Sequence, residues 1–167
     1  MTTIVGGASN DVLVGTEGGE ITLVSVGQFV SDYRQFEDPV FSPSGAKVAF
    51  SGQGWLVDGD ANNAIDVFIK NLDTGVTTIA STTAGGVQGN GTSDTPIFSP
   101  DGSRLMFRSD ASNLVAGDTN GVGDIFIKDL LTGAVTRVST AAAGQQGNGG
   151  AYLATFSPDG TKIVFYS

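Results

Sequence analysis

A repeat of 57 or 58 residues constrains the fold of this chain more than any other feature. The segment DVFIKNLDTGVTTIAST, which begins at Asp66, returns as DIFIKDLLTGAVTRVST at Asp124. The segment FSPSGAKVAF at Phe41 returns as FSPDGSRLMF at Phe98 and as FSPDGTKIVF at Phe156. Repeats of this length are supersecondary units that bury their apolar faces against one another. The chain is therefore predicted to be a row of similar units.

Each repeat predicts four short antiparallel strands, named a to d in chain order. The tetrapeptides that begin at Ser99 and Ser157 follow strand a and have proline second and glycine fourth, the pattern of a type I turn. In this central repeat we expect strand b over 104–108, strand c over 125–128 and strand d over 135–139. Four antiparallel strands with alternating short and long connections are typical of a β-propeller blade.

The two ends of the chain carry half a repeat each. The last residues match strands a and b, whereas 11–14 match strand c and 20–25 match strand d. We therefore predict a single half-propeller domain over 1–167. Its parts are the c and d strands of a split blade (1–25), two complete blades (37–82 and 94–140) and the a and b strands of the split blade (151–167).

Three blades are too few for a closed propeller, which has about four to eight. An open arc leaves an unpaired strand edge at each end. We expect an all-β, six-bladed ring formed by a homodimer, because a two-fold axis pairs both edges at once. The predicted seam joins Asp11, Val12, Leu13 and Val14 of one chain to Lys162, Ile163, Val164, Phe165 and Tyr166 of the other.

The phenylalanine that ends strand a recurs in each repeat. Phe41, Phe98 and Phe156 occupy this position. An apolar side chain at the same place in stacked units is expected to be buried, so all three are predicted to lie between neighbouring blades.

Composition limits the possible partners and chemistry. Eight Lys and Arg residues against 17 Asp and Glu residues give a net charge of −9, which argues against nucleic acid and anionic membrane surfaces as partners and suits divalent cations or basic partners. The chain has no Cys and no His, which excludes disulfides, thiolate or imidazole metal ligands and Ser–His or Cys–His nucleophiles. No apolar run approaches the length of a membrane span.

The long loop between strands b and c of the first complete repeat carries an acidic pattern. Asp58, Asp60, Asn62 and Asp66 stand at positions 1, 3, 5 and 9, and the carbonyl of Ala64 stands at position 7. Alternate oxygen ligands on a curved loop suit Ca²⁺, which takes roughly six to eight of them. The alternative is a set of Asx turns that close the loop without a metal.

The equivalent loop of the next repeat keeps Asp118, Asn120 and Asp124 but has Ala116 at the first position. Both interpretations, Ca²⁺ and turn closure, therefore stay open there. The split blade keeps only Asp11 of the pattern, so we expect no such site in it.

The motifs FSPDGxKIVFxS and DIFIxDLxTG together resemble the TolB-type, WD40-like propeller repeat of bacterial proteins. The resemblance implies a six-bladed ring and a bacterial extracellular or cell-envelope location, while the sequence at Met1 lacks the pattern of a signal peptide. The first acidic loop resembles the calcium loops of integrin α-subunit propellers, with Asn63 in place of the usual Gly. Residues 6–14 resemble the calcium-binding nonapeptide of RTX proteins, with Ser9 in place of Gly. We favour strand c for this segment, because the match to the blade repeat continues through strand d.

The b–c and d–a loops of a propeller lie on one face, where we expect binding because loops on a rigid scaffold usually carry it. Four aromatic residues from these loops are candidates for an exposed patch that would contact sugars or proteins: Phe29, Tyr33, Phe36 and Trp55. The alternative for each residue is packing over the blade core.

Three functions follow from these patterns. The first is a non-enzymatic, calcium-binding interaction or scaffold module that self-assembles by strand complementation and binds a protein or glycan on its long-loop face. The second is a structural fragment or engineered half-propeller whose only property is assembly. The third is a carbohydrate-active enzyme domain, but the polysaccharide-degrading propellers of this resemblance use histidine-based metal chemistry, and this chain has no histidine. We expect no enzymatic activity.

Overall fold

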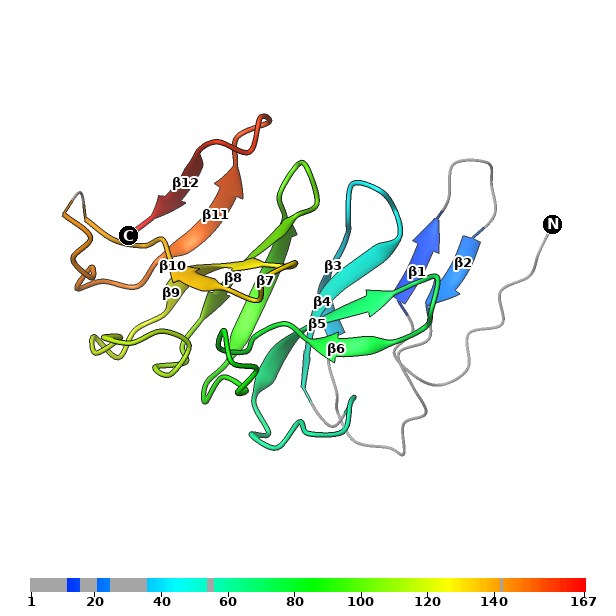
Figure 1. Ribbon diagram of the computed structural model, residues 1–167, viewed down its shortest axis with the longest axis horizontal. Coiled ribbons are helices and arrows are strands. Elements are labelled where there is room, and N and C mark those ends of the chain that lie inside the picture. The colour runs from blue at the N-terminus through cyan, green and yellow to red at the C-terminus, as the bar shows by residue number, and fades with distance from the viewer. Residues whose placement is uncertain (1–11, 16–20, 25–35, 54–55, 142) are drawn as a thin grey trace.

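The computed structural model describes residues 12–15, 21–24, 36–53, 56–141 and 143–167. These residues form strands, turns and loops (Figure 1). No helix within these ranges is long and apolar enough to cross a membrane. The strands are β1 (Val12–Gly15), β2 (Ile21–Val24), β3 (Phe36–Phe41), β4 (Lys47–Gln53), β5 (Ile65–Asn71), β6 (Thr77–Ile79), β7 (Ser93–Phe98), β8 (Arg104–Ser109), β9 (Asp124–Asp129), β10 (Val135–Arg137), β11 (Tyr152–Phe156) and β12 (Ile163–Tyr166).

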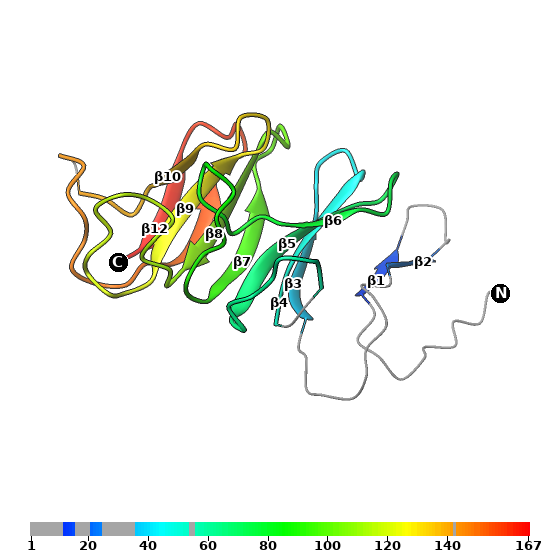
Figure 2. The same cartoon turned by 60° about the horizontal axis from the view of Figure 1, so that its bottom comes forward.

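The strands pair with their neighbours in chain order, as the repeat predicts. β3–β6 form one four-stranded antiparallel sheet and β7–β10 form another, while β1–β2 and β11–β12 are two-stranded antiparallel hairpins. Figures 1 and 2 show the two four-stranded sheets side by side, with the β1–β2 hairpin at one end of the row and the β11–β12 hairpin at the other. The all-β class and the four-stranded units are therefore confirmed. The six-bladed dimeric ring stays a prediction.

The tight turns after strand a use the residues that the turn geometry requires. The amide of Gly102 donates to the Ser99 carbonyl at 2.8 Å, and Gly102 has φ of 71°. This left-handed conformation suits glycine, which has no Cβ. The Asp101 carboxylate accepts bonds from the Ser99 hydroxyl at 2.5 Å and from the Ser103 amide at 3.0 Å. The Asp101 side chain thus stabilises the turn by bonding to residues on both sides of it.

The core lies between the sheets because strand residues alternate in direction. On β8, Leu105 and Phe107 belong to the cluster that joins the two four-stranded sheets, whereas Met106 belongs to the cluster shared with β11–β12. The rings of Phe107 and Phe126 stack with centroids 6.1 Å apart. Phe98 is 6% exposed in the same intersheet cluster, so its predicted burial is confirmed.

The burial prediction is wrong for Phe41 within a single chain, where it is 39% exposed. Phe41 is the repeat equivalent of Phe98, so it lies on the face of the first sheet that points away from the second sheet. Phe156 is half-buried, and the Arg104 guanidinium lies 5.5 Å from the centre of its ring. The position is therefore buried only where a neighbouring sheet covers it.

Strand a of each repeat contains a bulge that sequence reasoning did not predict. The register shifts between Glu37 and Val40 in β3, and at the equivalent places in β7 and β11. In each bulge one non-glycine residue has a left-handed backbone: Asp38 (φ 55°), Thr95 (φ 49°) and Leu153 (φ 51°). A bulge of this kind bends the strand and redirects a side chain.

Candidate functional site

A glutamine links the long loops of the first repeat. Gln88, from the loop between β6 and β7, donates from Nε2 to Asp60 Oδ1 and to Asp66 Oδ2, both at 2.8 Å. Its Oε1 accepts from the amide of Ala61 at 3.0 Å. One amide thus brings two carboxylates of the b–c loop together and fixes them to the d–a loop.

The inner carboxylate of this pair belongs to Asp66, which is fully buried. The Ser81 hydroxyl donates to Asp66 Oδ1 at 2.6 Å and accepts from the Val67 amide at 3.1 Å. Burial raises the pKa of Asp66, hydrogen bonds from Ser81 and Gln88 lower it, and the nearby Asp60 charge raises it further. The balance favours the protonated acid relative to a free aspartate.

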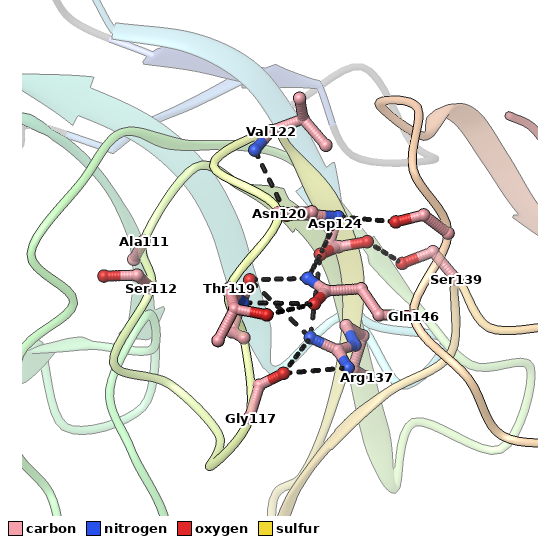
Figure 3. Close-up of polar contacts among 12 residues, drawn as sticks. Ala111, Ser112, Gly117, Thr119, Asn120, Val122, Asp124, Arg137, Ser139 and Gln146 are labelled. Atoms are coloured by element: carbon pink, nitrogen blue, oxygen red, sulfur yellow. Dashed lines mark hydrogen bonds and ion pairs between the residues drawn. The ribbon is translucent and has the colours of Figure 1, made fainter.

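The second repeat builds the same arrangement (Figure 3). Gln146 donates to Asp118 Oδ1 at 2.7 Å and to Asp124 Oδ2 at 3.1 Å, and the Ser139 hydroxyl donates to Asp124 Oδ1 at 2.6 Å. Gln146 Oε1 accepts from the Thr119 amide at 3.1 Å. The recurrence shows that this hydrogen-bond network belongs to the repeat.

The two networks differ in charge. In the second repeat Arg137 Nη1 lies 3.6 Å from Asp118 Oδ1 and 3.9 Å from Asp124 Oδ2. Both terminal nitrogens of Arg137 are also 3.5 Å from the Gly117 carbonyl. The equivalent residue of the first repeat is Ile79. A guanidinium therefore compensates the carboxylates of one repeat, and an aliphatic side chain stands at that position in the other.

The predicted calcium ligands divide into three groups. Asp60 and Asp66 converge on Gln88, whereas Asp58 is exposed. Asn62 is engaged in loop closure: its Oδ1 accepts from the Ala64 amide at 2.8 Å and its Nδ2 donates to the Gly89 carbonyl at 2.7 Å. These bonds are those of the Asx-turn alternative.

Asn120 makes the equivalent bonds in the second loop, from the Val122 amide at 3.2 Å and to the Gly147 carbonyl at 2.9 Å. In the part of the chain that the structure describes, no group of three or more His, Cys, Asp and Glu side chains gathers as a metal centre. Calcium binding by either loop stays a prediction.

Sequence reasoning missed the central residues of both networks. The acidic pattern of the b–c loops does not point to Gln88 or Gln146, which stand in the d–a loops. Their 58-residue offset is the same as that of Asp66 and Asp124, and this shared recurrence was the available signal. It does not by itself show that the loops meet in space.

The predicted aromatic patch receives no support from Phe36, its one member within the described residues. Phe36 is half-buried, with its ring edge-on to Phe50 at 5.9 Å between centroids. A Cβ on Gly52 would lie 2.3 Å from Phe36 Cδ1, so the ring fills the space above that glycine. This residue packs on the blade core because Gly52 leaves room for it. Trp55, Phe29 and Tyr33 lie outside the described residues.

A hollow lies where the strand-a bulges meet. It has a volume of about 440 Å³, and its lining includes Asp38, Thr95 and Leu153. Arg108 also lines it, with Nη1 3.2 Å from Asp94 Oδ2 and its guanidinium 5.1 Å from the centre of the Tyr152 ring. The lining combines acidic residues with the apolar side chains of Ile65, Tyr152 and Leu153.

The β11–β12 hairpin presents apolar side chains to solvent. Among the described strands β12 pairs with β11 alone, whereas the equivalent strands β4 and β8 each have two neighbours. Four large apolar side chains of the hairpin are exposed: Tyr152 (51%), Leu153 (81%), Val164 (64%) and Tyr166 (70%). Val164 and Tyr166 belong to the predicted seam, whose Asp11 lies outside the described residues.

Comparison with known proteins bears on the fold alone. No protein-family model matches the chain. No curated protein sequence matches it. Among solved structures, an oligogalacturonate lyase in complex with manganese matches with a TM-score of 0.52 and 17% identity over 90% of this chain. The match covers 33% of the lyase, so the chain spans about a third of that protein's length. The similarity supports a propeller-like β fold.

Proposed function

We propose that the chain is a non-enzymatic β-propeller module that associates with a second copy of itself and presents its long-loop face to a partner. The observation that carries this proposal is a contact that the chain already makes twice. Phe98 shares the intersheet cluster with Ala49, and Phe156 packs against the next cluster with Met106.

The next contact in this series is not made within the described part of the chain. By repeat offset, Val164 is equivalent to Ala49 and Met106, and Phe41 is equivalent to Phe98 and Phe156. Val164 is 64% exposed on the last hairpin, and Phe41 is 39% exposed on the outer face of the first sheet. The end of one copy therefore offers the surface that fits the beginning of another.

Edge pairing supports the same occupant. In each complete sheet the b strand pairs antiparallel with the c strand that follows it. β12 is a b strand with a free edge, and β1–β2 is a c–d hairpin. A second copy would supply to β12 the strand that β5 supplies to β4. Two such seams related by a two-fold axis would complete the six-bladed ring.

The long-loop face suits a partner because its loops are held by the glutamine networks and keep their shape when free. The net charge of −9 favours a basic protein surface. An activity on oligogalacturonate is not proposed. That polymer is acidic, and the hollow beside the bulges is lined by Glu37, Asp38 and Asp94.

Cross-linking between engineered cysteines tests the association, since the chain has no cysteine of its own. The double variant Phe41→Cys with Val164→Cys should form covalent dimers with a short bismaleimide. The control is Phe41→Cys with Val87→Cys, because Val87 has a similar exposure of 62% but lies away from the seam. The control should remain uncross-linked.

The mass in solution gives the second result. Light scattering at micromolar concentration should report about twice 17.0 kDa. A monomer would overturn the proposal, and it is the outcome expected if other propeller blades or a different protein cover these faces. A trimer or open oligomer with the same cross-link would retain the contact and contradict the six-blade count.

A further inference from the structure

The first repeat holds two buried carboxylates without a cation. Asp66 is fully buried and Asp60 is 7% exposed. Asp60 Oδ2 has no hydrogen-bond partner although it is buried, and no described Lys or Arg forms an ion pair with either residue. An unpaired buried charge is strongly unfavourable, so such a group takes up a proton, pairs with a cation or binds a metal.

The second repeat shows what the first lacks. There the Arg137 guanidinium lies within 4 Å of both Asp118 and Asp124, at 3.6 and 3.9 Å. Ile79 replaces it in the first repeat. The glutamine and serine hydrogen bonds of the network recur in both repeats, so the two repeats differ in the charge beside their carboxylates.

A second exchange accompanies the first. The repeat that has Arg137 carries Ala116 at the start of its loop, whereas the repeat that has Ile79 carries Asp58. The second repeat therefore combines two carboxylates with a guanidinium, and the first repeat has three carboxylates. A third carboxylate, that of the exposed residue Asp58, thus accompanies the missing guanidinium, and it would have to move inward to join the other two on an ion.

The structure also provides the space. A hollow of about 330 Å³ is lined by Asp58, Ile79 and Gln88 together. It opens beside Ile79, the residue that corresponds to Arg137, and reaches Gln88, which bonds both buried carboxylates, while Asp60 and Asp66 themselves lie behind its lining. A half turn of the Gln88 amide would present Oε1 to the ion in place of Nε2, at the cost of the hydrogen bond that Oε1 now accepts from the Ala61 amide.

We propose that the first repeat binds one hard divalent cation, for which Ca²⁺ is the probe ion. Asp60 and Asp66 hold the ion, and Asp58 is the outer ligand. In the second repeat the Arg137 guanidinium takes the place of this cation. Water completes the coordination, because Ca²⁺ takes roughly six to eight oxygens. Asn62 acts as a loop-closing residue, since both ends of its amide are already bonded. The site lies within one repeat and does not depend on assembly.

Calorimetric titration of the full chain with CaCl₂, after removal of metal by a chelator, tests the proposal. We expect one Ca²⁺ per chain, and at a concentration about a hundred times the Kd a rise in melting temperature of about 5–10 °C. Ile79→Arg should abolish binding. Asp118→Asn, the matched control in the second loop, should leave the affinity of the first loop unchanged.

Two further variants keep the proposal open to refutation if Ile79→Arg fails to fold. Asp60→Asn keeps the shape of the side chain and removes its charge, so the affinity should fall roughly tenfold or more. Arg137→Ile combined with Ala116→Asp should create a second Ca²⁺ site. Absence of binding by the parent chain, or unchanged binding by Asp60→Asn, would overturn the inference.

Discussion

Truncation of Phe98 should weaken the contact that holds the two four-stranded sheets together. Phe98 is 6% exposed, and its cluster includes Ala49 from the first sheet and Leu105 from the second. Removing a buried phenylalanine ring usually costs about 3–5 kcal/mol, because transfer energy is lost and a cavity remains. For a chain of this size each kcal/mol lowers the melting temperature by about 2–4 °C. Phe98→Ala should therefore melt about 6–20 °C below the parent.

Phe41→Ala is the matched control, since it removes the same ring at the equivalent position. Phe41 is 39% exposed, so the loss is a fraction of the transfer energy without a closed cavity, about 1–2 kcal/mol. Urea denaturation followed by circular dichroism should give the two free energies of unfolding, at a dilution where the chain is monomeric and with an unchanged m value. Equal losses for the two variants, or a Phe98→Ala protein that melts within about a degree of the parent, would refute the placement of the core.

Two further predictions use residues at equivalent positions of the repeats. Gly91→Ala should destabilise the protein by about 1–3 kcal/mol, because the new Cβ would lie 2.9 Å from the backbone of Asp110. At the equivalent position, a Cβ on Gly149 would meet no described atom within 4 Å beyond those of its chain neighbours, so Gly149→Ala should be tolerated. Thermal melts that rank the two variants in the opposite order would contradict the loop packing. In the turns after strand a, hydrogen bonds from neighbouring serine and threonine groups lower the pKa of Asp101 and of Asp159 to about 2 from the ordinary 3.8. Because these pKa values are lowered on folding, the two ionised carboxylates stabilise the folded protein above about pH 4, and this stabilisation is lost as the pH falls towards 2. The variant with both residues changed to Asn should therefore lose less stability over that interval. Acid titrations monitored by circular dichroism measure the difference.

The repeat was sufficient to predict the strands because their spacing is a local property. A short apolar run after a proline–glycine turn predicts β8, and the structure places it at Arg104–Ser109. The exposure of Phe41 was not predictable from its own repeat, since burial depends on whether another sheet covers that face. The bulge at Thr95 also lacked a clear signal. Thr95 and its repeat equivalent Asp38 precede proline, but the third equivalent, Leu153, precedes alanine.

The candidate site was predicted in part. The acidic spacing identified Asp60 and Asp66, and the structure brings both to one amide. The partner, Gln88, lies 28 and 22 residues further along the chain, and only the folded loops show that it reaches them. The difference between Ile79 and Arg137 is visible in the repeat itself. Its meaning is not, because the sequence does not tell which strand-d side chain points into the loop network.

The bulges of strand a separate backbone shape from surface chemistry. Three repeats keep a left-handed residue at one position, yet its side chain is an acid in Asp38, a hydroxyl in Thr95 and a hydrocarbon in Leu153. A conformation that is strained for most residues persists when the surrounding structure determines it. Since that conformation is kept with such different side chains, the backbone at this position does not depend on the side chain that it carries. Mutation can therefore change the charge, polarity or size of the wall of the hollow one repeat at a time, while the scaffold behind it stays as it is.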